Sequence, residues 1–362
     1  MGVPSIIRTV ATPVIALLLT AAVWNRNVPP ALLLLVGVGL VAAVLVAVHH
    51  AEVVAHRVGE PFGSLVLAVA VTVIEVGLIL SIMLSGGPDT ASLPRDTVFA
   101  AVMITTNGIV GICLLIGALR HHVVSFRTEG SSGALAAVLA LSTLCLVLPT
   151  FTTSSSGPTF SGVQLAFAAV VSLTLYGTYV FVQTVRHRDY FLPVPAAATD
   201  NCSEVHKQPP STRRALVSLV LLIVSLIAVV GLAKTISPAI ESGVNALGAP
   251  LSAVGVAIAL LVLLPETLAA VRAATLNRLQ TSFNLAYGSA LASIGLTIPT
   301  IAVASIWLQG PLLLGLSGTE MVLLALTGLI GILTVSLGTA IVLEGVIHLL
   351  IFAAFLFIAV TP

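Results

Sequence analysis

Long apolar stretches separated by short polar ones make up most of the 362-residue chain. A helix that crosses a membrane needs roughly 20 mostly apolar residues. Eleven stretches fit this requirement, although the first and fifth are short, so ten spans is the alternative. The eleven lie near residues 10–24, 28–49, 62–84, 97–119, 133–150, 161–185, 215–236, 250–271, 282–307, 319–337 and 341–360. The pattern predicts an all-α integral membrane protein with about 11 transmembrane helices.

Composition agrees with this fold class and excludes others. Hydrophobic residues make up 58% of the chain and charged residues only 7%, which no soluble domain of this length shows. The net charge of +1 gives no sign of nucleic-acid binding. Cys113, Cys145 and Cys202 have no paired spacing, which argues against a disulfide or a metal–thiolate site.

Basic residues predict which side of the membrane each loop occupies. If the N-terminus is cytoplasmic and there are eleven spans, 11 of the 14 Lys and Arg residues fall on the inner side. The inner set is Arg8, Arg57, Arg120, Arg127, Arg186, Arg188, Lys207, Arg213, Arg214, Arg272 and Arg278, and the outer set is Arg26, Arg95 and Lys234. This is the bias that the positive-inside rule predicts for this orientation.

A short repeated pattern divides the chain into two halves. Residues 52–61 read "EVVAHRVGEP" and residues 241–250 read "ESGVNALGAP", so that both follow E-x6-G-x-P. The most polar stretch, 186–214, lies between the halves and is rich in Pro, Ser, Thr and charge, as a cytoplasmic linker would be. We therefore predict a leading helix at 1–27, five-helix repeats at 28–185 and 215–362, and a linker at 186–214. Because five is odd, the second repeat enters the membrane inverted, and a substrate site is expected near the midplane.

Each predicted repeat carries an acid in the middle of an apolar span. Glu75 is the only charged residue from Phe62 to Leu84, and Glu266 follows Pro265 in "LLVLLPETLAAV". An ionised carboxylate at the bilayer centre costs at least ~2.5 kcal/mol. Each acid is therefore either a protonated packing residue or a group that binds something crossing the membrane. Their matching positions in the two repeats favour the second interpretation.

Two carboxylates in one dry site restrict the chemistry. They cannot both ionise cheaply, so without a cation the pair is expected to keep one or two protons. Ca²⁺ neutralises two negative charges and takes six to eight oxygen ligands. A site that holds either protons or a cation is the minimal requirement of an antiporter. The other candidate ligands are oxygen-bearing side chains: Thr72, Thr105, Thr106, Asn107, Ser289 and Ser293. No resident cofactor is expected.

Three stretches carry a family resemblance. They are "GEPFGSLVLAVAVTVIEV", "LLPETLAAVRAATLNRLQTSFNLAYGSALASIGLTIP" and "GTAIVLEGVIHLLIFAAFLF". They resemble bacterial calcium/proton antiporters of the ChaA type, in the cation/Ca²⁺ exchanger superfamily, over about residues 45–360. The resemblance implies two inverted repeats, exchange of cytoplasmic Ca²⁺ for protons, and Na⁺ or K⁺ exchange in some members. The central glutamates of the family fall on Glu75 and Glu266.

The chain departs from this family pattern beside both glutamates. Much of the superfamily has Gly-Asn shortly before each one, whereas this chain has Val71 and Thr72 before the first and Val262 and Leu263 before the second. The second repeat therefore lacks that polar ligand, which leaves the coordination set and the selectivity open.

Other acids have weaker claims to a role. Glu52 and Glu241 are candidates for acids that collect cations at the two mouths, or are simply solvated helix ends. Glu60 stands at a helix start, where the helix dipole favours an acid. Glu344 and His348 are four residues apart on the last helix and are expected to form a structural pair.

The sequence thus predicts a membrane antiporter that exports Ca²⁺ in exchange for H⁺, with the lipid bilayer as its surroundings. The alternatives are a Na⁺(K⁺)/H⁺ antiporter of the same fold and, less favoured, a cation channel, which would want repeated ligand rings along a wet pore. An enzyme is not expected, because the sequence holds no H-E-x-x-H motif and no nucleophile with a placed base. Oligomeric state is left open.

Overall fold

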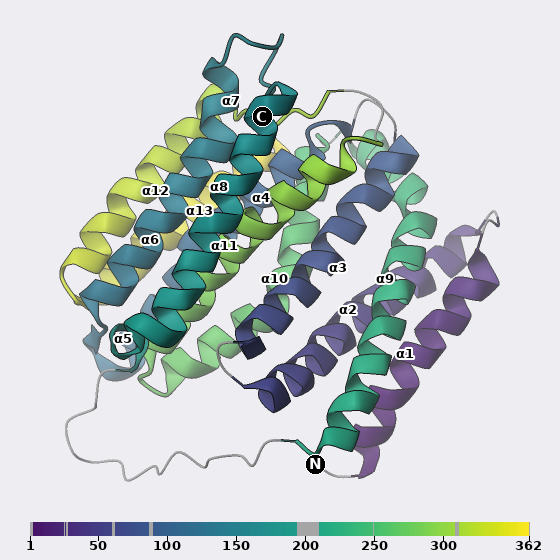
Figure 1. Ribbon diagram of the computed structural model, residues 1–362, viewed down its shortest axis with the longest axis horizontal. Helices are drawn as coiled ribbons and strands as arrows, with labels where there is room; N and C mark the ends of the chain where they lie inside the picture. Colours follow the sequence, from purple (N-terminus) through teal and green to yellow (C-terminus); the bar gives the residue numbers. More distant parts are fainter. Residues whose placement is uncertain are drawn as a thin grey trace. The chain divides into compact units, whose positions relative to one another are not determined.

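The computed structural model describes residues 3–24, 26, 28–59, 62–86, 90–193, 210–248, 250–307 and 311–361. The described chain is nearly all helical (Figure 1). Its helices are α1 (Val3–Val23), α2 (Pro30–Val58), α3 (Phe62–Gly86), α4 (Leu93–Met103), η2 (Ile104–Ile109), α5 (Val110–His121), α6 (Thr128–Ser142), η3 (Thr143–Val147), α7 (Leu148–Phe151), α8 (Gly162–Phe181), η4 (Val182–Arg186), η5 (Arg188–Phe191), α9 (Thr212–Leu247), α10 (Ser252–Thr275), α11 (Leu279–Ala304), α12 (Gly318–Ser336) and α13 (Val342–Val360). Two short strands, β1 (Val124–Ser125) and β2 (Thr339–Ala340), pair antiparallel.

Ten helices of the described chain are long and apolar enough to cross a membrane. An apolar span must satisfy its backbone hydrogen bonds internally, and a helix does so along its whole length. Three of the spans contain π-helical turns: α4, η2 and α5 form one rod, α6, η3 and α7 form another, and α8 continues into η4. The first predicted segment is a helix whose apolar part, Thr9–Val23, is shorter than a full span. The prediction of an all-α membrane fold is confirmed.

The described chain forms two compact units. Unit 1 contains residues 1–93 and 208–254, and unit 2 contains residues 94–207 and 255–362. Each unit therefore takes helices from both halves of the sequence: α1, α2, α3 and α9 in unit 1, and the remaining helices in unit 2. The division into sequence repeats stays a prediction, since the units cut across it.

Small residues bring the helices of unit 1 close together. Figure 1 shows α1 and α9 side by side. A Cβ atom added at Gly231 of α9 would collide with Thr20 of α1. The Thr20 hydroxyl lies 2.8 Å from the carbonyl of Ala16 and 3.4 Å from that of Ala228, so it bridges its own helix and α9. Close approach of backbones through small residues is the usual way in which membrane helices associate.

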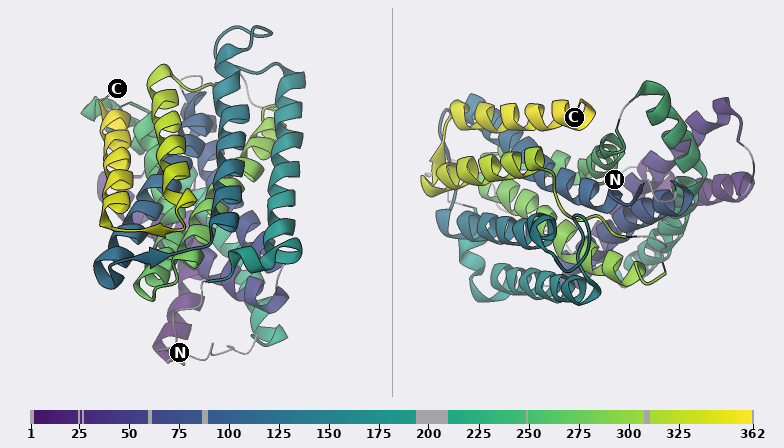
Figure 2. Two further views of the ribbon diagram at one scale, coloured as in Figure 1. Left: turned by 90° about the vertical axis from the view of Figure 1, so that its left-hand side faces the viewer. Right: turned by 90° about the horizontal axis from the view of Figure 1, so that it is seen from above.

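In unit 2, glycines hold α13 against the rod formed by η2 and α5. Figure 2 shows α13 and α12 next to each other at the C-terminal end of the colour scale. A Cβ atom at Gly345 would lie 2.6 Å from the backbone nitrogen of Leu115 and 2.9 Å from its Cα. A Cβ atom at Gly111 would lie 3.0 Å from the Cβ of His348. The backbones of α5 and α13 are therefore in direct contact.

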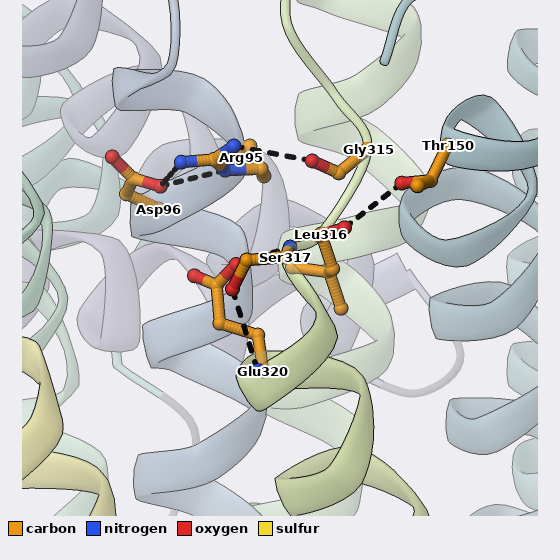
Figure 3. A network of polar contacts seen from close by, with 7 residues as sticks. All are labelled: Arg95, Asp96, Thr150, Gly315, Leu316, Ser317 and Glu320. Atoms are coloured by element: carbon orange, nitrogen blue, oxygen red, sulfur yellow. Dashed lines mark hydrogen bonds and ion pairs between the residues drawn. The ribbon is translucent and has the colours of Figure 1, made fainter. Parts of the chain in front are cut away.

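A polar network ties together one end of unit 2 (Figure 3). Arg95 pairs with buried Asp96 at 2.7 Å and donates a hydrogen bond to the carbonyl of Gly315. The Thr150 hydroxyl donates to the carbonyl of Leu316. Helix α12 then begins at a capping box, in which Ser317 and Glu320 each bond the other's backbone N–H. This network fixes the segment before α12 against α4 and α7.

We predict that Gly345→Ala destabilises the protein by roughly 1–3 kcal/mol, because the new methyl group would overlap the Leu115 backbone. The matched control is Gly177→Ala in α8, where an added Cβ has nothing within 4 Å. There the change is expected to be neutral or to stabilise by up to ~1 kcal/mol through helix propensity. Thermal unfolding of both purified variants in detergent measures the difference. Equal melting temperatures would contradict the close α5–α13 packing.

Candidate cation-binding residues

Glu75 lies near the middle of α3 in unit 1 and is 3% exposed. Thr72, one helical turn before it, is buried as well. Helix α3 is fixed against α9 just beyond this acid, because a Cβ atom at Gly77 would lie 2.8 Å from the Val230 side chain. The Ser81 hydroxyl also donates to the carbonyl of Gly77 at 2.6 Å. Glu75 therefore stands on a segment of α3 that tight packing holds in place.

Glu266 lies on α10 and is 8% exposed. Pro265 is inside the helix, where it removes one backbone donor and so frees a carbonyl group. In unit 2, α10 is anchored on both sides of this acid. A Cβ atom at Gly255 would lie 2.9 Å from the backbone nitrogen of Thr97 on α4. Further along, His121 of α5 donates to the carbonyl of Thr275 at 3.3 Å.

These two anchors fix the level of Glu266 along the rod of α4, η2 and α5. An α-helix rises about 1.5 Å per residue, so Glu266 lies ~16 Å beyond Gly255. Counting the same distance from Thr97 along the rod reaches the end of η2. Counting back from His121 by the distance that separates Thr275 from Glu266 reaches the first turn of α5. Helix α10 thus carries Glu266 to the level of the π-helical turn, inside unit 2 alone.

The π-helical turn η2 consists of Ile104–Ile109, and all six residues are buried. A π-turn breaks the regular α-helical ladder and is frequently found at functional sites. Here threonine hydroxyls bond the carbonyls near the break. Thr105 donates to the carbonyls of Ala101 and Val102, and Thr106 donates to that of Val102 at 2.6 Å. The turn therefore concentrates hydroxyl and carbonyl oxygens, the atom type that hard cations prefer.

Asn107 is fully buried and its amide is held by neighbouring helices. Its Nδ2 group donates to Thr327 of α12 at 2.9 Å and to Thr106 at 3.2 Å. Its Oδ1 atom lies 3.1 Å from Nδ1 of His348 on α13. As a direct cation ligand Asn107 stays a prediction, and the structure gives it a second role as the centre of a hydrogen-bond network.

The other predicted ligands of unit 2 lie on α11, which packs against η2 and α8. Ser293 is buried and Ser289 is half-buried. Close packing of α11 on α8 comes from its glycines, since a Cβ atom at Gly295 would lie 2.6 Å from the Cβ of Tyr176. Unit 2 therefore contains Glu266, the π-turn and both α11 serines, whereas Glu75 and Thr72 belong to unit 1.

The weaker candidates have mixed outcomes. Glu52 is exposed on α2. Glu60 lies outside the described residues, as does the side chain of Glu241, whose backbone belongs to α9. Glu344 and His348 interact electrostatically, but their hydrogen bonds go to other groups. Glu344 accepts from the backbone N–H of Ile341, three residues before it at the start of its own helix, while His348 bonds Asn107 and Thr334.

Sequence reasoning missed the partners of Asn107. On other helices they are Thr327 and His348, and His348 in turn lies 3.1 Å from Thr334. All three are buried polar residues on apolar helices. Their only signal in the sequence is a polar residue in an otherwise apolar span, which is costly without a partner. That signal marks the residues as engaged but cannot name the helix on which the partner lies.

Comparison with known proteins adds the family. The sodium/calcium exchanger protein family model matches residues 28–185 and 217–361. An ionic transporter, y4hA, of Sinorhizobium fredii (strain NBRC 101917 / NGR234) is 48% identical over 331 residues, covering 91% of this chain and 89% of its own. The sodium-potassium/proton antiporter ChaA of Escherichia coli (strain K12) is 33% identical and covers 95% and 93%. The crystal structure of an H⁺/Ca²⁺ exchanger, CAX, is similar in fold, with a TM-score of 0.68, 17% identity, and coverage of 96% and 86%.

Proposed function

Because the chain belongs to the sodium/calcium exchanger family, we propose that it is a secondary antiporter that exports Ca²⁺ from the cytoplasm in exchange for protons. It is a multi-pass membrane protein of a transporter family. We further propose that it lies in the inner membrane with its N-terminus in the cytoplasm. The excess of Lys and Arg on the predicted inner loops supports this orientation.

The observation that carries the proposal is the burial of two acids within apolar spans. Among the described residues the buried acids are Glu75, Asp96 and Glu266. Asp96 stands in the first turn of its helix, where Arg95 balances its charge. Glu75 and Glu266 instead lie deep within α3 and α10. Buried ionisable residues inside a membrane span mark ion or proton pathways more often than packing sites.

The proposed mechanism is competition for the same carboxylates. A cation that approaches Glu75 or Glu266 stabilises the ionised form, whereas a proton makes the group a poor ligand. Protons and cation therefore exclude one another, and each displaces the other as the protein opens to either side. That both carboxylates act on one cation is a prediction from the sequence repeat, and it is tested by whether either substitution alone abolishes exchange.

Oxygen atoms from hydroxyl groups complete the proposed ligand sets. Thr72 accompanies Glu75, and in unit 2 the π-turn and α11 supply Thr105, Thr106, Ser289 and Ser293. The exposed acid Glu52 is proposed to collect cations at the inner mouth, with an effect that salt screens. We propose the same vestibule role for Glu60 and Glu241 from sequence alone.

A second candidate is exchange of Na⁺ or K⁺ for protons. The relative from Escherichia coli is named a sodium-potassium/proton antiporter, and its 33% identity extends over 95% of this chain. Ca²⁺ and Na⁺ have similar radii, so that oxygen ligands alone do not separate them. Proton-driven ⁴⁵Ca²⁺ uptake into inside-out vesicles, with Na⁺, K⁺, Mg²⁺ and Mn²⁺ as competitors, distinguishes the two candidates. No ⁴⁵Ca²⁺ uptake, together with proton-driven uptake of Na⁺ or K⁺ by the same vesicles, would favour the second.

We predict that Glu75→Gln and Glu266→Gln each reduce exchange by more than tenfold. The amide keeps the size of the side chain but removes the negative charge that the cation requires. The measurement is initial ⁴⁵Ca²⁺ uptake, normalised to the amount of inserted protein. The control is Glu129→Gln on α6, where the acid is exposed and exchange should be unchanged. Near-normal exchange by Glu266→Gln would make that residue a packing residue and would overturn the shared-site mechanism.

We also predict that acid on the cytoplasmic side weakens the apparent affinity for Ca²⁺. Protonated carboxylates bind the cation poorly, so the apparent KM should rise as the pH falls, by up to about tenfold per pH unit for each proton displaced. Saturating Ca²⁺ should restore the maximal rate when the pH of the opposite side is held constant. Initial rates across a series of Ca²⁺ concentrations and pH values test this. An effect on the maximal rate alone would place the proton pathway on other residues.

A further inference from the structure

The π-turn η2 lies between two groups of helices in unit 2. On one side it packs against α11, which carries Ser289 and Ser293. It also packs against α12 and α13, on which the sequence predicts no cation ligand. A contact with α12 or α13 that holds the π-turn in place therefore also holds the oxygen atoms of the turn in place.

A chain of hydrogen bonds connects η2 to α12 and α13. Nδ1 of His348 lies 3.1 Å from Oδ1 of Asn107, and Nε2 of His348 lies 3.1 Å from the hydroxyl of Thr334. The Asn107 amide nitrogen donates to Thr327, whose hydroxyl in turn lies 3.5 Å from the Met103 sulfur. Asn107, His348, Thr327 and Thr334 are all buried. The network therefore lies entirely inside unit 2.

The chemistry of the partners assigns a role to each ring nitrogen. The Oδ1 atom of an asparagine only accepts, so Nδ1 of His348 must carry the hydrogen. Nε2 of the neutral ring is then an acceptor and takes the hydrogen of the Thr334 hydroxyl. The two ring nitrogens thus have different roles. Nδ1 donates to Asn107 of the π-turn, and Nε2 accepts from Thr334 of α12.

The imidazole ring also has a hydrogen bond to the backbone of Thr106, in the same π-turn, and glycine packing brings α13 close to that turn. A Cβ atom at Gly111 would lie 3.0 Å from the His348 Cβ, and one at Gly108 would lie 3.3 Å from the Phe352 ring. Helix α13 therefore packs closely against η2 and the first turn of α5 around His348. This contact brings the ring to Asn107, a residue 241 positions earlier in the chain.

We propose that His348 is a positioning residue for cation exchange, acting through its Nδ1–H bond to Asn107. By holding that amide, His348 keeps the π-turn in its position against α12 and α13, and it thereby keeps the Thr105 and Thr106 hydroxyls in place. His348 itself touches neither cation nor proton in this role. The inference rests on the proposed exchange function, because its readout is transport.

Two substitutions separate the two sides of the ring. The side-chain amide nitrogen of asparagine reaches about the position of Nδ1, whereas the amide of glutamine reaches about that of Nε2. His348→Asn keeps a donor for Asn107 and should retain exchange within about threefold of the wild type. His348→Gln keeps a partner for Thr334 but leaves Asn107 Oδ1 without its donor. Its apparent KM for Ca²⁺ should rise about tenfold, the usual effect of losing one buried hydrogen bond.

Two further variants test whether the effect passes through Asn107. Thr334→Val removes only the Nε2 partner and should behave like His348→Asn. In an Asn107→Ala background, His348→Gln should cause little additional loss, because residues that act through one bond are not additive. Melting temperature and the yield of monodisperse protein in detergent are measured for every variant, so that rates refer to folded protein.

Three outcomes overturn the proposal: equal exchange by His348→Gln and His348→Asn, fully additive losses with Asn107→Ala, or losses that only track the amount of folded protein. Each of them would leave the exchange function intact. A wild type that exchanges neither Ca²⁺, Na⁺ nor K⁺ for protons would instead contradict the proposed function, and with it the role of His348.

Discussion

The low dielectric constant around a buried carboxylate constrains everything else in this protein. Glu75 and Glu266 are nearly inaccessible within long apolar helices. A negative charge there needs a proton or a cation beside it, because desolvation makes the bare charge costly. Because the ionised carboxylates are costly to bury, each is expected to bind either a proton or a cation. Exchange follows if the two occupants arrive from opposite sides of the membrane.

In unit 2 the backbone is interrupted in two neighbouring spans. Pro265 interrupts the backbone ladder of α10 directly before Glu266, and η2 interrupts that of the neighbouring rod at the same level. Both interruptions lie in spans where an unsatisfied backbone group would be costly, which is why threonine hydroxyls and the Asn107–His348 network surround the π-turn. Irregular backbone, close glycine contacts and buried hydrogen bonds therefore belong to one arrangement. The network links the irregular turn to α12 and α13.

Much of this could be predicted from residue pattern alone, and the rest could not for physical reasons. Hydropathy located the spans, because the bilayer requires long apolar helices, and it left open only the first segment, whose apolar stretch is short. Glu75 and Glu266 stood out, because a charge in an apolar span is rare. The partners of Asn107 were out of reach, since spacing along one helix suggested Glu344 for His348 whereas contact between distant helices supplied Asn107. The compact units were also missed, because a repeat in sequence does not say which helices pack together.

The central claim is that cation and protons compete for the same two carboxylates, and proton release on binding tests it most directly. Ca²⁺ is titrated into the purified protein in weakly buffered detergent solution, with a pH indicator and a calorimeter as detectors. We predict that Ca²⁺ binding releases protons when the starting pH leaves the carboxylates protonated. Release should disappear in both Glu75→Gln and Glu266→Gln, together with binding, and persist in Glu129→Gln. Tight Ca²⁺ binding with no proton release at any pH, or unchanged release in Glu266→Gln, would contradict the account.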